Sequence, residues 1–280
     1  MAHLSPNPAH IPFEPENAEP FADTVPPGRR FVSYAARGLA RLVDIVTPPV
    51  CLNCHEPLST KDTLCPPCWT KIDFIRQPLC DRLGIPLPYD SGAGTLSAQA
   101  VAEPPLYARA RAVARYDGVM RQLIHDLKFH DRHDARKLFG RWLAEAGKGL
   151  ISDADVIVPV PLHRWKLLKR RFNQSAILSA ELSRLTGKAN APLVLKRTRR
   201  TIPQLGLTAT QRQQNVKGAF SIPLRLKPVV QGRRVLLIDD VITTGATISA
   251  ATAALLSAGA TGVDVLALAM VTDTTSTLDA

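Results

Sequence analysis

The sequence is poor in aromatic residues and lacks the two common nucleotide-binding fingerprints. Aromatic residues make up 5% of its 280 residues, so stacking surfaces for nucleic-acid bases are poorly supplied. Neither G-x-G-x-x-G nor G-K-[ST] occurs, which excludes the usual dinucleotide and nucleoside-triphosphate loops. No apolar run approaches the roughly 20 residues that span a bilayer. What remains is a globular chain, 45% hydrophobic, whose function has to be sought in other motifs.

Cysteine is also scarce, with five residues, whereas positive charge is abundant. The formal net charge of +11 suits a partner that carries phosphate, either a nucleotide-like ligand or a nucleic-acid backbone. The N-terminal segment has neither the basic start nor the apolar core of a secretory signal. We therefore expect a cytoplasmic protein, in which paired cysteines favour metal over disulfides.

Residues 235–247 carry the clearest chemical pattern of the chain. They read V-L-L-I-D-D-V-I-T-T-G-A-T, an apolar run followed by two carboxylates and a turn rich in hydroxyls and glycine. The run is typical of a parallel strand buried on both faces. Beyond the turn, Ile248, Ala251 and Leu255 recur at helical spacing and predict a helix. Backbone N–H groups at the start of that helix can hold a phosphate, and the carboxylates can accept hydrogen bonds from sugar hydroxyls.

This pattern resembles the phosphoribosyl-pyrophosphate (PRPP) signature of type I phosphoribosyltransferases. The resemblance implies that Asp239 and Asp240 bind the ribose hydroxyls and support charge at the anomeric carbon during catalysis. It also implies that the turn surrounds the 5-phosphate, with Thr243, Thr244, Gly245, Ala246 and Thr247 as the binding residues. The alternative is an ordinary strand-to-helix turn whose Asp and Thr side chains only cap the helix. Doubled acids before a doubled threonine and a glycine are hard to obtain that way, so we favour the ligand site.

Four of the five cysteines form two C-x-x-C pairs separated by ten residues, namely Cys51, Cys54, Cys65 and Cys68. Each pair can approach one ion from a tight turn, and two pairs complete the closed tetrahedral thiolate site of a structural zinc. The spacer is shorter than in the commonest zinc ribbons. The alternatives are a disulfide pair or four unrelated thiols.

Two basic segments accompany these motifs. The first follows the expected strand end at residues 158–161 and contains His163, Arg164, Lys166, Lys169, Arg170 and Arg171. Backbone N–H groups and guanidinium forks suit a diphosphate, but a solvated turn or a nucleic-acid patch remains open. The second, residues 196–200, adds four positive charges and is equally suited to tracking the phosphates of single-stranded DNA.

Alternating strands and helices predict an α/β fold with a mostly parallel sheet and helices on both faces. We expect strands at 111–116, 156–160, near 192–196, 235–238 and 262–270, with helices at 119–129, 132–146 and 174–185. The predicted organisation is a disordered tail (1–30), a helix and zinc-ribbon module (31–90), a linker (91–106), a phosphoribosyltransferase-like domain (107–272) and a second tail (273–280).

Together these features resemble the ComF family, which is associated with DNA uptake in naturally competent bacteria. Further motifs agree: Y-D-G-V-M-R-Q-L-I-H-D-L-K-F from Tyr116, V-P-V-P-L-H-R-W-K-L-L-K-R-R-F-N-Q-S from Val158, and Q-x-x-L-x-x-x-x-R-x-x-N-V-x-G-A-F from Gln204. The likeness covers about residues 40–270. It implies a pyrophosphate-binding loop flanked by Arg170 and Arg171, a covering loop at residues 204–215, and Mg²⁺ bound with PRPP.

One departure from the family pattern concerns the second zinc site. Many relatives have a double ribbon with a second set of four cysteines, but here only Cys80 stands where such a pair would begin, and residues 96–100 contain no cysteine. We therefore expect one zinc per chain.

Two functions are compatible with the resemblance. In the first, the protein binds PRPP and transfers its phosphoribosyl group to a nitrogen acceptor. In the second, it is a non-catalytic accessory of competence that binds single-stranded DNA and a helicase-like partner, with a regulatory PRPP pocket. The pocket residues favour ligand binding, whereas no base-specificity element is recognisable, so transfer itself is left undecided.

Overall fold

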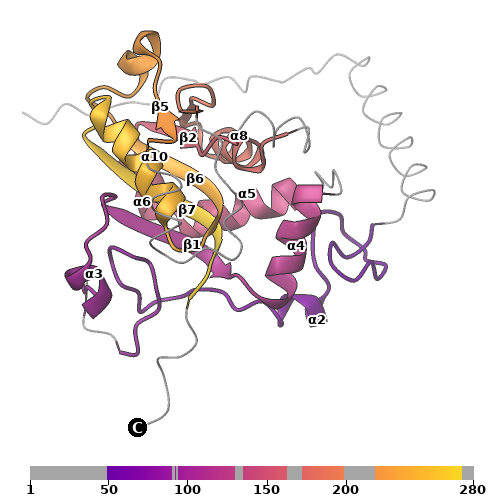
Figure 1. Cartoon of the computed structure of the whole chain (residues 1–280). Coiled ribbons are helices and arrows are strands. Elements are labelled where there is room, and N and C mark those ends of the chain that lie inside the picture. The colour runs from indigo at the N-terminus through magenta and orange to yellow at the C-terminus, as the bar shows by residue number, and fades with distance from the viewer. Residues whose placement is uncertain are drawn as a thin grey trace, which may run out of the picture. The chain divides into compact units, whose positions relative to one another are not determined.

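A parallel five-stranded sheet forms the centre of the structure (Figure 1). The computed structural model describes residues 49–89, 92, 94–129, 135–162, 172–198 and 218–272. The strand order is β1-β7-β6-β2-β3, and every neighbouring pair is parallel. The strands are β1 (Arg109–Arg115), β2 (Val156–Pro159), β3 (Ala189–Asn190), β6 (Arg234–Ile242) and β7 (Gly262–Met270). The expected parallel α/β sheet is confirmed.

Helices cover both faces of this sheet, as predicted. They are α4 (Gly118–Phe129), α5 (Ala135–Ala146), α6 (Lys148–Asp153), α8 (Gln174–Thr186) and α10 (Ala246–Ser257). Alternate residues of β6 separate the two cores, as the period-2 geometry of a strand requires. Leu236 and Ile238 pack with α4, α5 and α8, whereas Val235 and Leu237 pack with α10. Among the described residues, no helix has the length and apolar character needed to cross a membrane.

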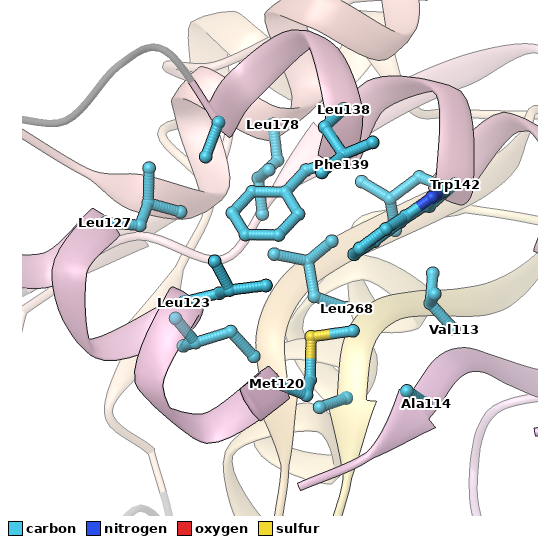
Figure 2. Packing of buried hydrophobic residues seen from close by; sticks show 14 of the residues in the cluster. Val113, Ala114, Met120, Leu123, Leu127, Leu138, Phe139, Trp142, Leu178 and Leu268 are labelled. Carbon is cyan, nitrogen blue, oxygen red and sulfur yellow. The ribbon is translucent and has the colours of Figure 1, made fainter. Parts of the chain in front are cut away.

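The core between the sheet and helices α4, α5 and α8 is the first core, and Phe139 of α5 lies at its centre. Figure 2 shows its ring facing Leu123 and Leu127 of α4, with Leu268 of β7 beneath it. Phe139, Leu123 and Leu127 are each at most 2% exposed. This packing fixes the position of α4 against the sheet, and α4 delivers a side chain to the ligand cleft described below.

The connections that leave β2 and β6 run to opposite faces of the sheet. The chain after β2 leads to α8 on one face, whereas the chain after the adjacent β6 leads to α10 on the other. Such a switch between neighbouring parallel strands opens a crevice at their carboxyl ends, where α/β proteins bind ligands. The acidic pair stands at this place, at the end of β6.

The strand expected near residues 192–196 is replaced by three short elements. Residues 189–190 form β3 at the edge of the main sheet, residues 191–195 form a turn, and β4 (Lys196–Arg197) pairs with β5 (Phe220–Ser221) in a separate antiparallel ribbon. Pro192, which lacks a backbone N–H, interrupts the segment. Leu195 and Val194 are buried as predicted for an apolar stretch, but they are not in a strand. A 3-10 helix, η1 (Leu224–Val229), then leads toward β6.

The N-terminal cysteine module is built as two similar halves. In the first, the Cys51 N–H donates to Glu56 O (2.8 Å), and in the second the Cys80 N–H donates to Ile85 O (2.8 Å). Each half ends in a short helix, α2 (Pro66–Trp69) or α3 (Ala98–Ala102). The sequence retains only Cys80 of the second set of four cysteines, as expected for a lost second zinc site, whereas the backbone hydrogen bonds shared by the two halves are seen only in the structure.

The segment expected to be a linker, residues 91–106, contains α3 and belongs to the second half. The Ser97 N–H donates to Cys80 Sγ (3.2 Å), as the Cys65 N–H does to Cys51 Sγ (3.3 Å) in the first half. Composition alone suggested a loop here, since Gly, Pro and Ser are frequent. In the structure, Ser97 and α3 instead form part of the ribbon.

Both halves pack on the sheet domain. The Trp69 ring of the first half lies 5.6 Å from the Trp142 ring of α5, in an edge-to-face arrangement. In the second half, Asp81 accepts hydrogen bonds from the Arg111 guanidinium of β1, one at its carboxylate and one at its backbone carbonyl, both at 2.7 Å. The ribbon is therefore joined to the sheet domain by aromatic packing in its first half and by an ion pair in its second half.

Candidate ligand cleft and cysteine cluster

A cleft of about 230 Å³ opens at the carboxyl ends of β2 and β6. The end of β6 and the start of α10 contribute Asp239, Asp240, Val241, Ile242, Thr243, Gly245, Thr247 and Ile248, and other elements contribute Lys128, Val160, Pro161, Leu162, Gln174, Ser175 and Arg197. The cleft therefore lies at the switch point between β2 and β6. Five of the predicted site residues line it.

Asp239 is the buried member of the acidic pair, with an exposed fraction of 9%. Its Oδ1 accepts a hydrogen bond from the Ser175 hydroxyl (3.1 Å) and one from the Asp240 N–H (2.9 Å). Burial and the adjacent charge of Asp240 raise the pKa of Asp239 to about 7, against the opposing effects of these hydrogen bonds and of Lys128. Burial and the neighbouring carboxylate therefore make this carboxyl hold its proton more tightly than an exposed aspartate does.

Asp240 forms an ion pair with Lys128, whose Nζ lies 2.8 Å from Asp240 Oδ2. Each of these side chains is 17% exposed. Asp239 and Asp240 therefore differ in surroundings: the first is held by a neutral hydroxyl and a backbone N–H, the second by a cation.

The turn after β6 has the geometry of an anion-binding helix start. Gly245 adopts a left-handed conformation (φ 72°) directly before α10, which an L side chain would adopt with strain. The first N–H groups of a helix have no partner within it, and the helix dipole favours an anion there. Thr243, Gly245 and Thr247 line the cleft, whereas Ala246 is buried in the core beneath it and Thr244 is exposed. Arg170 and Arg171 lie outside the described residues.

Four cleft residues were not predicted as site residues from the sequence. Three of them, Lys128, Gln174 and Ser175, were given no role, and the fourth, Arg197, was noted only as part of the second basic segment. The Arg197 guanidinium lies 5.4 Å from the centre of the Phe220 ring. Burial lowers the pKa of Arg197, and the charge of Asp239 opposes that effect. Each of the four stands within or beside a motif of the family resemblance, but only the fold shows that they meet the acidic pair.

Gln174 is a buried amide at the beginning of α8. It is 1% exposed, and among the described residues no group accepts a hydrogen bond from its Nε2. The neighbouring Asn173 donates from Nδ2 to Val160 O (3.0 Å), which ties the start of α8 to the end of β2. The cleft therefore presents a fixed donor where an oxygen-rich ligand would be bound.

The four predicted zinc ligands are brought together. The Sγ atoms of Cys51, Cys54, Cys65 and Cys68 all lie within 4.8 Å of one another, close to the edge of about 3.8 Å expected for a tetrahedral zinc–thiolate site. Burial raises the pKa of the Cys51 thiol, but hydrogen bonds from backbone N–H groups, with that of Cys65 the largest, lower it overall to about 6. These donors favour the thiolate form of Cys51, whereas, against a hydrogen bond from the backbone of Cys68, burial and the neighbouring thiols raise the pKa of Cys65 to about 12.

The corresponding place in the second half holds a single cysteine, Cys80. Cys80 is fully buried, and its Sγ accepts hydrogen bonds from the N–H groups of Ser97 (3.2 Å) and Leu83 (3.5 Å). Leu83 follows Cys80 at the spacing by which Cys54 follows Cys51. Within the described part of the chain, the four-cysteine cluster of the first half is the one group suited to hold a metal ion.

Family models match both parts of the chain. Residues 42–100 match a double zinc ribbon domain, and residues 175–279 match a phosphoribosyl transferase domain. The protein is thus a zinc-ribbon protein with a phosphoribosyltransferase-type α/β domain. The match and the four-thiol cluster together support a structural zinc.

Relatives that match over nearly their whole length identify the family within this class of proteins. The chain is 33% identical to DNA utilization protein YhgH of Escherichia coli over 231 residues, covering 80% of this chain and 98% of that protein. It is 30% identical to competence protein F of Haemophilus influenzae over 225 residues, covering 78% and 96%. The chain belongs to the ComF family.

Solved structures of phosphoribosyltransferases were also matched. Glutamine PRPP amidotransferase from B. subtilis is 25% identical with a TM-score of 0.36, over 51% of this chain and 30% of that one. Adenine phosphoribosyltransferase from Thermoanaerobacter pseudethanolicus is 17% identical with a TM-score of 0.32, over 50% and 83%.

Proposed function

We propose that the protein binds PRPP, or a related phosphoribosyl ligand, in the cleft at the end of β6. The observation that carries this proposal is the convergence of three features in one cleft: the Asp239–Asp240 pair, the start of α10 and the buried donor of Gln174. A ribose 5-phosphate offers hydroxyls to the carboxylates and a dianion to the helix start. Mg²⁺ accompanies PRPP and neutralises its diphosphate.

Transfer of the phosphoribosyl group to a nitrogen acceptor is the reaction that such a site would support. It proceeds through positioning and electrostatic stabilisation and requires no protein nucleophile. Asp239 and Asp240 would hold the ribose and place negative charge near the anomeric carbon as positive charge develops there. Arg170 and Arg171 are proposed as ligands of the diphosphate. No aromatic side chain is among the described lining residues.

The experiment that tests binding is calorimetric titration of PRPP and ribose 5-phosphate into the zinc-loaded protein, with and without Mg²⁺. Pyrophosphate release from PRPP, measured with a panel of nitrogenous bases, then separates transfer from binding alone. Heat of binding without pyrophosphate release would identify a binding protein; absence of both would refute the proposal.

A second candidate function is binding of single-stranded DNA as a non-catalytic accessory of competence, in which the PRPP pocket is regulatory. It is favoured by the net charge of +11 and by the names of the relatives, which refer to DNA utilization and competence. A helicase-like protein is the partner proposed for this role, in the cytoplasm, where the five cysteines would remain reduced thiols. Affinity for a labelled oligonucleotide at two salt concentrations tests it, because phosphate contacts make affinity fall steeply with salt.

A further inference from the structure

Lys128 is the last cation of α4, and the core holds it beside the ligand cleft. The preceding residue, Leu127, is 1% exposed and packs with Leu123 in the first core. Figure 2 shows both side chains directed from α4 toward Phe139. Because α4 is fixed in this way, its last turn delivers Lys128 to Asp240 from an element that has no other part in the site.

The Lys128–Asp240 pair differs from an ordinary surface ion pair. Both side chains are 17% exposed, whereas Lys137, paired with Asp62 at 3.0 Å, is 53% exposed. Exposed pairs contribute little because water screens them, but partners withdrawn from water depend strongly on each other. Removing Lys128 would leave Asp240 with its charge and without its counter-ion, directly beside Asp239.

We propose that Lys128 is a positioning residue of the cleft: its ammonium group, 2.8 Å from Asp240 Oδ2, holds that carboxylate in place, so that the acidic pair can accept hydrogen bonds from the hydroxyls of a ribose. This inference rests on the proposed function of the cleft. Lys128 acts through Asp240 and needs no contact with the sugar. Ligand binding need not break the ion pair, because a sugar hydroxyl can donate a hydrogen bond to Asp240 while Lys128 remains paired with it.

The charges around Asp239 show why a cation is required. Asp239 faces the carboxylate of Asp240 within its own strand, the ammonium of Lys128 from α4 and the guanidinium of Arg197 from β4. The group contributed by α8, the Ser175 hydroxyl, is neutral. Among the described residues, removal of Lys128 would leave Arg197 as the cation that acts on Asp239, and proton uptake by the acidic pair would become more favourable.

A double-mutant cycle tests this role. Affinity for ribose 5-phosphate is measured by calorimetry at pH 7.5 for the wild type, Lys128→Met, Asp240→Asn and the combined variant. We expect Lys128→Met to weaken binding about tenfold and to add nothing when Asp240 is already Asn, because a residue that acts through another loses its effect when that other is changed. If the affinity losses of the two single variants instead multiply in the combined variant, Lys128 acts independently of Asp240, and the positioning role is overturned.

PRPP serves as the second ligand in the same cycle. Lys128→Met should lower the affinities for PRPP and for ribose 5-phosphate by similar factors, since both ligands present the same ribose hydroxyls. A loss confined to PRPP would instead identify Lys128 as a diphosphate contact. Lys137→Met is the matched control, because it removes the same side chain from an exposed pair and should leave both affinities unchanged.

A measurement without ligand keeps the two proposals separable. Carboxyl carbon resonances of aspartate, followed by NMR from pH 4 to pH 9, should show the proton release of Asp239 moving to higher pH in Lys128→Met and staying in place in Lys137→Met. An unmoved titration overturns the role of Lys128, whatever the ligand experiments show. If the wild type binds neither sugar phosphate, the proposed function fails, while this titration still decides whether Lys128 controls the acidic pair.

Discussion

The Ser175 hydroxyl donates a 3.1 Å hydrogen bond to Asp239 Oδ1 and so connects the start of α8 with the end of β6. These elements belong to neighbouring strand–helix units whose helices lie on opposite faces of the sheet. Ser175 is 4% exposed and Asp239 is 9% exposed, so the bond is protected from water. This contact fixes the orientation of the buried acid at the switch point.

Substituting Ser175 should therefore weaken the proposed ligand site without unfolding the protein. In Ser175→Ala, Asp239 loses a donor that favours its charged form, so its pKa rises further above 7. We expect about a threefold to tenfold loss of affinity for ribose 5-phosphate at pH 7, corresponding to the roughly 0.5–1.5 kcal/mol of one hydrogen bond. Calorimetry at pH 7 and pH 9 checks this, because the loss should shrink at the higher pH. A loss that is equal at both pH values would contradict the explanation.

Asp239 should also make the free energy of unfolding depend on pH. Its pKa is about 7 in the folded protein, above the ordinary value of 3.8. The folded state thus holds this proton more tightly than the unfolded chain, and the contribution of Asp239 to stability falls as pH rises from about 4 to about 7. Asp239→Asn removes this loss and should raise the free energy of unfolding by roughly 2 kcal/mol at pH 8, with a smaller gain at pH 5. Urea unfolding at both pH values is the measurement, and a gain of equal size at both would argue against it.

The cysteine cluster is expected to hold one zinc, and that zinc should stabilise the packing of Trp69 on Trp142. Trp69 ends α2, one residue after Cys68, and its ring lies 5.6 Å from that of Trp142. Chelation of the metal, or Cys65→Ser, should release α2 and change the tryptophan fluorescence, because structural zinc supplies folding energy to small ribbons. Metal analysis should find one zinc per chain in the wild type and none in the variant. Cys80→Ser is the control, and it should retain the metal; two zinc ions per chain would refute the assignment.

A separate charge cluster joins the amino ends of β1, β7 and β6, at the end of the sheet opposite to the cleft. Asp264 of β7 is fully buried and accepts two hydrogen bonds from Arg109 of β1 (3.1 and 2.8 Å) and two from Arg234 of β6 (2.8 and 3.0 Å). Burial raises the pKa of Asp264, but the two guanidinium groups outweigh it and hold this pKa below its usual range. Its contribution to stability is therefore present above the unfolded-state pKa and is lost as pH falls through the folded-state value.

Asp264→Asn should accordingly be strongly destabilising. It leaves two guanidinium groups without their shared counter-ion, which costs roughly 3–5 kcal/mol for a buried pair. Asp153, which pairs with the same Arg109 but has a side chain that is 49% exposed, is the matched control. Asp153→Asn should cost little stability, because water screens this exposed partner. Denaturant unfolding compares the two, and similar small losses would show that the cluster does not clamp the three strands.

The sequence predicted those parts of the site that are continuous in the chain. The apolar strand, the acidic pair and the helix start follow one another within residues 235–247, so local patterns were sufficient to place them. The strand at residues 262–270 was predicted with its observed bounds, since a fully buried parallel strand is a continuous apolar run. The cysteine cluster was predictable for a similar reason, because metal ligands follow strict spacings.

Features that depend on tertiary contacts were not predictable in the same way. Lys128 is one of 35 basic residues and has no local signature; only the packing of α4 on the sheet brings it to Asp240. Ser175 likewise meets Asp239 across 64 positions of the chain. The sequence indicated the second half of the ribbon only through Cys80, because Leu83, Ser97 and Ala100 occupy the places of the other metal ligands without carrying ligand chemistry. Backbone hydrogen bonds, rather than cysteines, preserve that half.

Titration of PRPP into the zinc-loaded protein in the presence of Mg²⁺, alongside the Asp239→Asn/Asp240→Asn double variant, tests the cleft itself. The wild type should bind with one site per chain, and the double variant should lose at least about a hundredfold in affinity, because two hydrogen-bonded carboxylates are removed from the ribose. Circular dichroism and zinc content should be unchanged, so that the loss is assigned to the site. Equal PRPP affinity in the wild type and in a folded double variant would contradict the assignment of Asp239 and Asp240 as the ribose-binding pair.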